Sequence, residues 1–160
     1  MIKLISIDSS TKKTGVAYFE NGSLKKYFLL ESSNSDVDVR FCEIVKQLYD
    51  VLNEYMPDIV WIEDTWNANN IQTTKVLSKL IGTVYGWCIV KSKEFHTILP
   101  SEWRKYCGIS QSKMKRAELK QASIAYVKNR YDIDVNDDVA DAISMGDGIV
   151  NYFQTEELFE

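Results

Sequence analysis

The first twenty residues constrain the fold of this chain more than any other stretch. An apolar run from Ile2 to Asp8 is followed by a hydroxyl-rich segment and Gly15, and a second apolar run begins at Val16. This pattern predicts a buried strand, a turn and a second strand. Asp8 then lies at the end of the first strand beside an apolar interior, where an ionised carboxylate must be compensated. It either accepts hydrogen bonds from the turn or binds a cation.

The next segments extend this sheet. Asn21-Gly22 is typical of a two-residue hairpin turn, so residues 23–30 are predicted to form the third strand of an antiparallel meander. Apolar residues at helical spacing over 37–52 predict a helix, which Asn34, Ser35 or Asp36 can cap and Pro57 ends.

A second acid follows a second buried strand. The run over residues 58–62 is apolar apart from its first residue and closes with Glu63. Because a helix connects this strand to the meander, we expect it to lie parallel to the first strand. Parallel neighbours present their carboxyl ends at one edge of the sheet, where open α/β sheets bind ligands. Asp8 and Glu63 are therefore expected to meet.

The remainder of the chain is expected to hold a short fifth strand and three helices. The strand covers residues 95–99, and the helices cover residues 70–90, 112–128 and 138–153. The first of these helices is apolar on more than one face, and its Gly82 and Gly86 would allow another helix to approach closely. It is either covered within the monomer or shared with a second copy of the chain, and we favour the second.

Length and composition indicate one intracellular globular domain. The chain of 160 residues can bury a proper core, and its 45% of hydrophobic residues include no run long enough to cross a membrane. The amino terminus lacks the features of a secretion signal. An acidic tail over residues 154–160 is expected to be loosely held.

The cysteine and histidine content disfavours several classes of site. Cys42, Cys88 and Cys107 are odd in number and far apart, so neither a disulfide framework nor a zinc site is indicated. His96 is the single histidine, and it lies in a short predicted strand. Mechanisms that pair a nucleophile with a histidine base are therefore not favoured.

Charge is distributed unevenly along the chain. The formal net charge is −4, which by itself argues against a nucleic-acid partner. Residues 101–130, however, carry eight Lys or Arg against two Asp or Glu, whereas residues 131–160 carry nine acidic residues and no basic one. The basic block is either the solvated surface of a helix or a patch that tracks phosphate groups.

Acidic residues from three parts of the chain suggest a metal site. Asp138 and Asp141 are three residues apart in the predicted last helix, so they project from one face. Together with Asp8 and Glu63 they offer only oxygen ligands, which suit magnesium or manganese better than zinc. Two such ions about 3.5–4 Å apart can activate a water and stabilise the leaving oxygen of a phosphodiester.

The order of elements and the acid at the end of the first strand resemble the ribonuclease H-like superfold, and within it the RuvC family of Holliday junction resolvases. The matching segments are residues 7–10 with Thr14-Gly15, Ile62-Glu63 before Trp66, and residues 138–142. The matching segments span nearly the whole chain, and residues 1–160 are expected to form a single nuclease domain. It implies an α/β fold whose five-stranded mixed sheet, three antiparallel strands and then two parallel ones, is flanked by helices.

The resemblance also implies the chemistry. Asp8, Glu63, Asp138 and Asp141 correspond to the family's catalytic, metal-binding acids, with Asp137 as an alternative to Asp138. Two Mg²⁺ ions per active site are expected, and Mn²⁺ is expected to substitute. Water would attack the phosphodiester and leave a 5′-phosphate and a 3′-hydroxyl, and a homodimer would make paired nicks.

Contacts with DNA are implied in the same way. Trp66 occupies the position of a family aromatic that stacks near the open centre of a junction, and ordinary packing is its alternative. The basic residues that the resemblance and the charge pattern suggest for DNA binding are Lys12, Lys13, Arg104, Lys113, Lys115 and Arg116.

The leading hypothesis is therefore a magnesium-dependent endonuclease that resolves four-way or related branched DNA junctions. One alternative is a nuclease of the same superfold for another structured nucleic acid, such as an RNA–DNA hybrid or a pre-ribosomal RNA. A second is a junction-binding protein without catalysis, although a pure binder gains nothing from four acids that repel phosphate. Actin-like ATPases also begin with a strand, an Asp and a Thr/Gly-rich hairpin, but they need two such domains.

Overall fold

The computed structural model describes residues 1–10, 12–64, 70–109 and 112–156. The strands are β1 (Lys3–Ser9), β2 (Lys13–Glu20), β3 (Ser23–Glu31), β4 (Ile59–Glu63) and β5 (Glu94–Ile98). The helices are α1 (Val37–Tyr55), α2 (Ile71–Lys91), α3 (Pro100–Tyr106), α4 (Arg116–Tyr131) and α5 (Asp137–Glu156). No helix in the described part of the chain combines the length and the apolar character that a membrane span requires.

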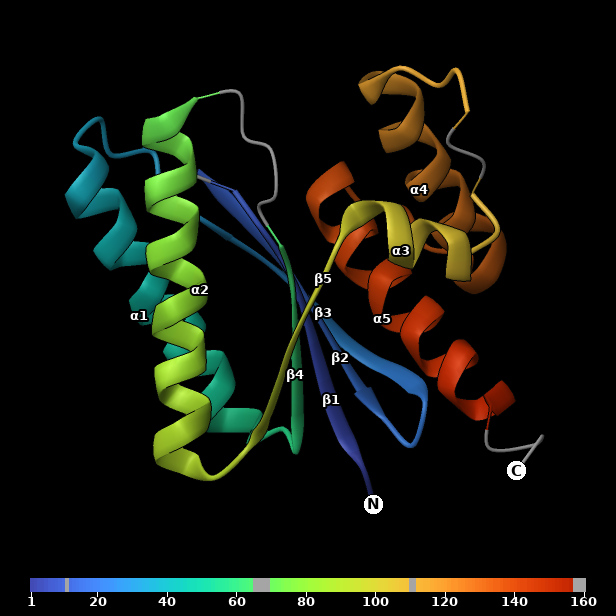
Figure 1. Ribbon diagram of the computed structural model, residues 1–160, viewed down its shortest axis with the longest axis horizontal. Coiled ribbons are helices and arrows are strands. Elements are labelled where there is room, and N and C mark those ends of the chain that lie inside the picture. Colours follow the sequence, from blue (N-terminus) through green and yellow to red (C-terminus); the bar gives the residue numbers. More distant parts are fainter. Residues whose placement is uncertain (11, 65–69, 110–111, 157–160) are drawn as a thin grey trace.

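The strands form one mixed sheet in the order β3-β2-β1-β4-β5 (Figure 1). The pairs β1–β2 and β2–β3 are antiparallel, whereas β1–β4 and β4–β5 are parallel. The prediction of three antiparallel strands followed by two parallel ones is confirmed.

Local sequence explains several element boundaries. Asn21 and Gly22 both adopt positive φ, as the predicted tight hairpin between β2 and β3 requires. The Asp36 side chain accepts hydrogen bonds from the backbone of Asp38 and Val39 and so caps α1. Both features follow from residues that the sequence pattern had singled out.

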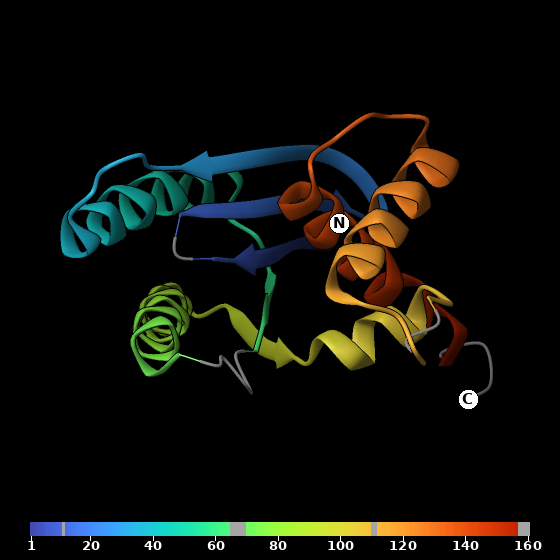
Figure 2. The ribbon, with the colours of Figure 1, turned by 90° about the horizontal axis from the view of Figure 1, so that it is seen from above.

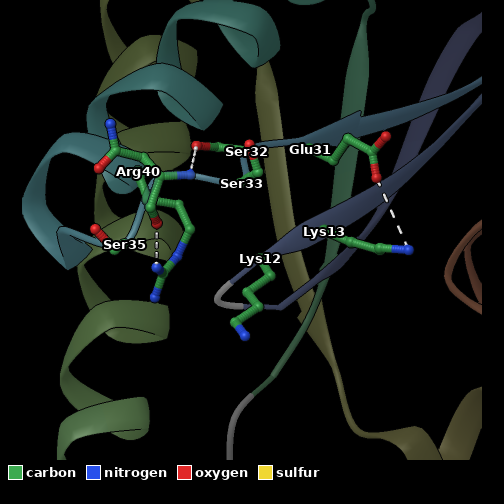
Figure 3. A pocket seen from close by; sticks show the side chains of 8 residues that line it. Lys12, Lys13, Glu31, Ser32, Ser33, Ser35 and Arg40 are labelled. Carbon is green, nitrogen blue, oxygen red and sulfur yellow. Dashed lines mark hydrogen bonds and ion pairs between the residues drawn. The ribbon is translucent and has the colours of Figure 1, made fainter.

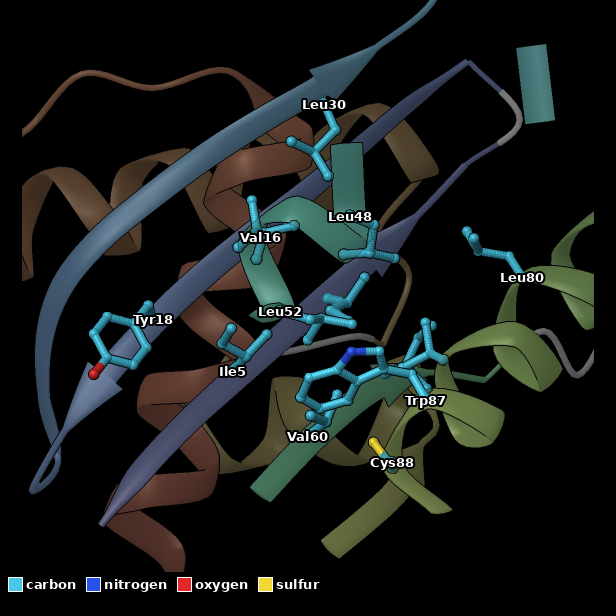
Figure 4. Close-up of a cluster of buried hydrophobic side chains, with 14 residues drawn as sticks. Ile5, Val16, Tyr18, Leu30, Leu48, Leu52, Val60, Leu80, Trp87 and Cys88 are labelled. Atoms are coloured by element: carbon cyan, nitrogen blue, oxygen red, sulfur yellow. The ribbon is translucent and has the colours of Figure 1, made fainter. Parts of the chain in front are cut away.

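Helices cover both faces of the sheet. α1 and α2 lie on one side, and α3, α4 and α5 lie on the other (Figure 1 and Figure 2). Successive β1 side chains alternate between two cores, as a strand requires: Ile5 and Ile7 pack with α1 and α2, and Leu4 packs on the α5 side. Figure 4 shows the first core, in which Leu48 from α1 and Trp87 from α2 approach the sheet.

α5 lies against the sheet at two glycines. A Cβ on Gly15 of β2 would stand 2.0 Å from the backbone oxygen of Asp138, and a Cβ on Gly146 would stand 2.3 Å from the Phe19 ring. Both distances are far below van der Waals contact, so only glycine fits either position. The Ser6 hydroxyl also donates to the backbone oxygen of Ala142 at 2.7 Å. These contacts fix the first turns of α5 beside β1 and β2.

A buried carboxylate ties α4 to α5. Asp147 of α5 is only 1% exposed and accepts hydrogen bonds from the hydroxyls of Tyr126 and Tyr131, the latter at 2.6 Å. The Arg130 guanidinium lies 3.3 Å away. Burial and the hydrogen bond to Asp147 raise the pKa of both tyrosines, so their hydroxyls remain donors.

The start of α4 differs from the prediction. The sequence pattern placed it at Ser112, but α4 begins at Arg116 because Lys113 adopts a positive φ of 66° that a helix cannot contain. The backbone N–H of Lys115 instead donates to the Glu118 side chain, which caps the helix. The basic residues at 113–115 therefore lie on the segment that leads into α4.

Candidate active site

Two parallel strands bring Asp8 and Glu63 to the same edge of the sheet. Ile7 of β1 pairs with Ile62 of β4, so the acids that follow them in sequence are neighbours at the carboxyl ends of the two strands. β1 ends at Ser9, one residue later than predicted, so Asp8 is its penultimate residue. Glu63 is the last residue of β4. Both side chains are partly buried.

α5 supplies the other two predicted acids. Asp138 and Asp141 lie in its first turns, where Gly15 lets the helix backbone touch β2. Asp141 is only 7% exposed, and its Oδ1 is buried without a hydrogen-bond partner among the described residues. A buried carboxylate oxygen in this state is costly unless a further group satisfies it.

The other three acids repel Asp8. Burial raises the pKa of Asp8 well above its usual value, and the negative charges of Glu63, Asp141 and Asp138 raise it further. Lys120 of α4 acts in the opposite direction. Since Coulomb interactions of this kind weaken with distance, the structure brings these four predicted residues into one electrostatic cluster.

Two members of the cluster titrate close to neutral pH. Burial raises the pKa of Glu63 to about 7, against a lowering contribution from its hydrogen bond with Trp103. Burial raises the pKa of Asp141 to about 6, against lowering contributions from Ser123, Arg104 and Lys120. Both carboxylates are therefore poorly compensated when ionised.

The residues fit a hard divalent cation by chemistry, although their side chains are not arranged as a finished binding site. Among residues 1–10, 12–64, 70–109 and 112–156, no three His, Cys, Asp or Glu side chains form a group that could hold an ion as they stand. The donors are nevertheless all carboxylate oxygens, which Mg²⁺ and Mn²⁺ prefer. One of them, Asp141 Oδ1, lacks a hydrogen-bond partner among those residues. A cation would relieve both the repulsion and this unsatisfied atom.

These shifts predict that the stability of the metal-free protein falls as pH rises. Glu63 has a usual pKa of 4.5 and a folded pKa of about 7, so its contribution to stability is present at low pH and is lost as pH rises through this window. Asp141 acts in the same direction up to about pH 6. Mg²⁺, which binds ionised carboxylates, should raise the unfolding temperature more at about pH 8 than at about pH 5. An equal Mg²⁺ effect at both pH values, measured by thermal denaturation, would contradict this expectation.

Lys120 is a site residue that the sequence analysis missed. Its Nζ forms an ion pair with Asp137, and its charge lowers the pKa of Asp8, Asp138 and Asp141. The signal was present in the sequence, because Lys120 lies one helical turn after Arg116 on α4. Lys120 also lowers the pKa of Asp137, so that carboxylate is already compensated by a cation.

The predicted DNA-binding residues of α3 and α4 fall into two groups. Arg104 lies beside the acids: its charge lowers the pKa of Glu63 and Asp141. Arg116 also lowers the pKa of Glu63, although its own side chain is exposed. Lys113 and Lys115 are exposed on the segment before α4.

Lys12 and Lys13 line a cavity of about 830 Å³ beside the turn that follows β1 (Figure 3). Its other lining residues come from the end of β3, the segment that follows it and the first turn of α1; they are Glu31, Ser32, Ser33, Asn34, Ser35 and Arg40. Lys13 lies 3.8 Å from Glu31, and its charge also lowers the pKa of Asp138. The cavity is thus rich in cationic and hydroxyl groups and adjoins the acid-bearing edge of the sheet.

Two tryptophans bear on the predicted site. Trp66 lies outside the described residues. Trp103 of α3 was not predicted, yet its indole Nε1 donates to Glu63 Oε2 at 2.8 Å. Trp103 follows Glu63 by 40 positions in the chain, and no sequence pattern indicates this contact.

Known proteins share both the sequence pattern and the fold. A family model described as crossover junction endodeoxyribonuclease RuvC matches residues 4–146. No curated protein sequence matches the chain. Thermus thermophilus RuvC in complex with a Holliday junction substrate is similar with a TM-score of 0.76 and 12% identity over 97% of this chain and 96% of that one.

Two resolvases from other sources are also similar in structure. The yeast mitochondrial Holliday junction resolvase Ydc2 has a TM-score of 0.68 and 13% identity, over 98% of this chain and 80% of that one. The fowlpox virus resolvase in complex with Holliday junction DNA has a TM-score of 0.66 and 15% identity, over 95% of this chain and 99% of that one. The likeness confirms the predicted ribonuclease H-like fold.

Proposed function

The chain belongs to the RuvC family of crossover junction endodeoxyribonucleases, and we propose that it cuts four-way DNA junctions at a centre formed by Asp8, Glu63, Asp138 and Asp141. Membership makes it a junction-resolving nuclease; the residues of the centre are our assignment. The observation that supports this assignment is geometric: Asp8 and Glu63 end neighbouring parallel strands, and Gly15, which pairs with Asp8, lies against the backbone of Asp138. In agreement with this, burial raises the pKa of Asp8, and the charges of the other three acids raise it further. On this assignment, acids from β1, β4 and α5 share one site, and a bound cation or a proton would relieve the repulsion between them.

The centre is proposed to hold two Mg²⁺ ions, with Mn²⁺ able to substitute. Nucleases of this family depend on metal ions, and ions bound at these carboxylates would activate a water and stabilise the leaving oxygen. The neighbouring cations Lys120, Arg104 and Arg116 reduce the negative potential that a phosphodiester would meet on entering. We assign Asp138 rather than Asp137 to the centre, because Asp137 is already paired with Lys120.

Two basic surfaces near the acids are proposed to hold the DNA backbone. One consists of Lys113, Lys115 and Arg116 at the start of α4. The other is the cavity beside Lys12 and Lys13, where the hydroxyls of Ser33 and Ser35 could donate to phosphate oxygens (Figure 3). The Ser32 hydroxyl already donates to Glu43. Trp66, three residues after Glu63, is proposed to stack on a base near the open centre of the junction.

A homodimer is proposed to make the paired nicks, with α2 as its contact. Ser78, Gly82, Tyr85 and Ile89 follow one another at helical spacing along α2, and all four are exposed. Apart from Gly82 itself, its two chain neighbours and the nearby backbone of α2, no atom of the described residues lies within 4 Å of where a Cβ on Gly82 would be. A second helix could therefore approach this stripe closely.

Replacing Gly82 with Glu is expected to weaken the dimer without disturbing the monomer fold. The new side chain meets open space in the monomer, but it would place a charge in the α2–α2 contact. Sedimentation at micromolar concentration should show the variant shifted toward monomer, with an unfolding temperature no lower than that of wild type. The matched control is Gly82→Ala, which adds little bulk and favours the helix by up to about 1 kcal/mol. A Gly82→Glu variant that sediments as wild type would place the contact elsewhere.

Cleavage of a panel of substrates tests the function. With Mg²⁺, the protein should nick a synthetic four-way junction in opposing strands faster than a linear duplex, a flap or an RNA–DNA hybrid, and EDTA should abolish nicking. Faster cleavage of the hybrid would favour the alternative substrate class. Binding of the junction with no cleavage in either Mg²⁺ or Mn²⁺ would favour the noncatalytic alternative and overturn the proposal.

A further inference from the structure

Trp103 connects α3 to the end of β4. Its side chain is fully buried in the core on the α5 side of the sheet. Its indole N–H donates to one oxygen of Glu63, Oε2, at 2.8 Å. Indole nitrogen is a donor only, so this contact requires an oxygen acceptor and cannot be reversed.

We propose that Trp103 is a positioning residue for Glu63: it holds one carboxylate oxygen so that the other is presented to the metal centre. This inference rests on the proposed function, because it takes Glu63 as a metal ligand. A glutamate side chain has several rotatable bonds and loses appreciable entropy when it is fixed. A hydrogen bond already present in the folded protein removes most of that loss before a cation binds.

The indole is itself held by the helix that carries the other acids. Trp103 packs in one core with Val139 and Ala140 of α5, which lie between Asp138 and Asp141 in sequence. Gly148 allows α3 to lie close to α5, since a Cβ there would stand 3.3 Å from the backbone oxygen of Trp103. The indole therefore contacts both Glu63 of β4 and the part of α5 that carries Asp138 and Asp141.

Arg104 adds to this arrangement. Its guanidinium lies over the Trp103 ring, 4.7 Å from the centroid, so the same indole that binds Glu63 also locates a cation beside it. The Arg104 Nε is buried and has no hydrogen-bond partner among the described residues. The contact with the Trp103 ring, and not a hydrogen bond from Nε, is therefore the interaction that relates this charge to Trp103.

The decisive substitution replaces Trp103 with 3-benzothienylalanine, which has nearly the shape of tryptophan but carries sulfur in place of the N–H. Mn²⁺ binding, followed by the electron paramagnetic resonance of the free ion, is expected to weaken by about 10–100-fold. The matched control is the same replacement at Trp87, a buried indole that donates to Asn53 at 3.0 Å in the other core. That control should bind Mn²⁺ as wild type does.

If the substituted protein fails to fold, a measurement on the wild-type side chain still tests the proposal. In ¹⁵N-tryptophan-labelled wild-type protein, the indole resonance of Trp103, assigned with Trp103→Phe, should shift during a Mg²⁺ titration, whereas that of Trp87 should not. Unchanged Mn²⁺ affinity after benzothienylalanine replacement, alongside lost affinity in Asp8→Asn, would overturn the positioning role and leave the proposed function standing. Unchanged affinity in both variants would overturn the carboxylate centre itself.

Discussion

Replacing Asp8 with Asn is expected to slow junction cleavage by about 10³-fold, equivalent to about 4 kcal/mol of lost transition-state stabilisation. The pKa of Asp8 is raised by burial and by the charges of Glu63, Asp141 and Asp138. On the proposed assignment, Asp8 is the ligand that interacts with all three other acids, so its loss should weaken the centre most. Single-turnover cleavage of a labelled four-way junction at saturating Mg²⁺ measures the effect.

The same substitution should stabilise the metal-free fold. Because the folded protein disfavours ionised Asp8, a neutral Asn of similar size relieves repulsion at about pH 8. The unfolding temperature in EDTA should therefore rise, and added Mg²⁺ should no longer raise it as much as in wild type. Asp50→Asn changes an exposed carboxylate of α1 and serves as the control for both measurements. Wild-type cleavage by Asp8→Asn would exclude Asp8 from the centre.

Replacing Asp147 with Ala is expected to lower the free energy of unfolding by about 3–5 kcal/mol. The substitution leaves the hydroxyls of the partly buried Tyr126 and Tyr131 without their acceptor, and it removes the partner of Arg130. Each buried donor without a partner costs about 1–3 kcal/mol, and a cavity adds to this sum. Urea denaturation measures the change.

The control for Asp147 is an ion pair of similar length at the surface. Asp134 lies 3.1 Å from Lys128, but its side chain is 87% exposed. Asp134→Ala should therefore cost no more than about 1 kcal/mol. If the two substitutions had equal effects, the Asp147 cluster would not be what holds α4 on α5.

The sequence was sufficient for those parts of the site that depend on local pattern and strand direction. Asp8 and Glu63 follow apolar runs joined through a helix, and the preference for a parallel arrangement of such strands places them together. Asp138 and Asp141 follow from the spacing of a helix face. The places of these four acids in the fold could therefore be predicted, whereas their role as a metal centre stays a prediction.

Contacts between distant side chains could not be predicted. Trp103 meets Glu63 across forty residues, and the tyrosine partners of Asp147 lie on another helix. The start of α4 was misplaced because the positive φ of Lys113 is a backbone state that helical spacing does not reveal. In each case the deciding contact or conformation depends on tertiary structure rather than on sequence period.

The contact between Gly15 and the start of α5 bears on when the enzyme can become active during its synthesis. β1 and β2 leave the ribosome early, whereas α5 is translated more than a hundred residues later. A nascent chain that has released β4 but not α5 carries Asp8 and Glu63 without Asp138 and Asp141. On the proposed assignment, such a chain holds half of its metal ligands and cannot cut the DNA around it.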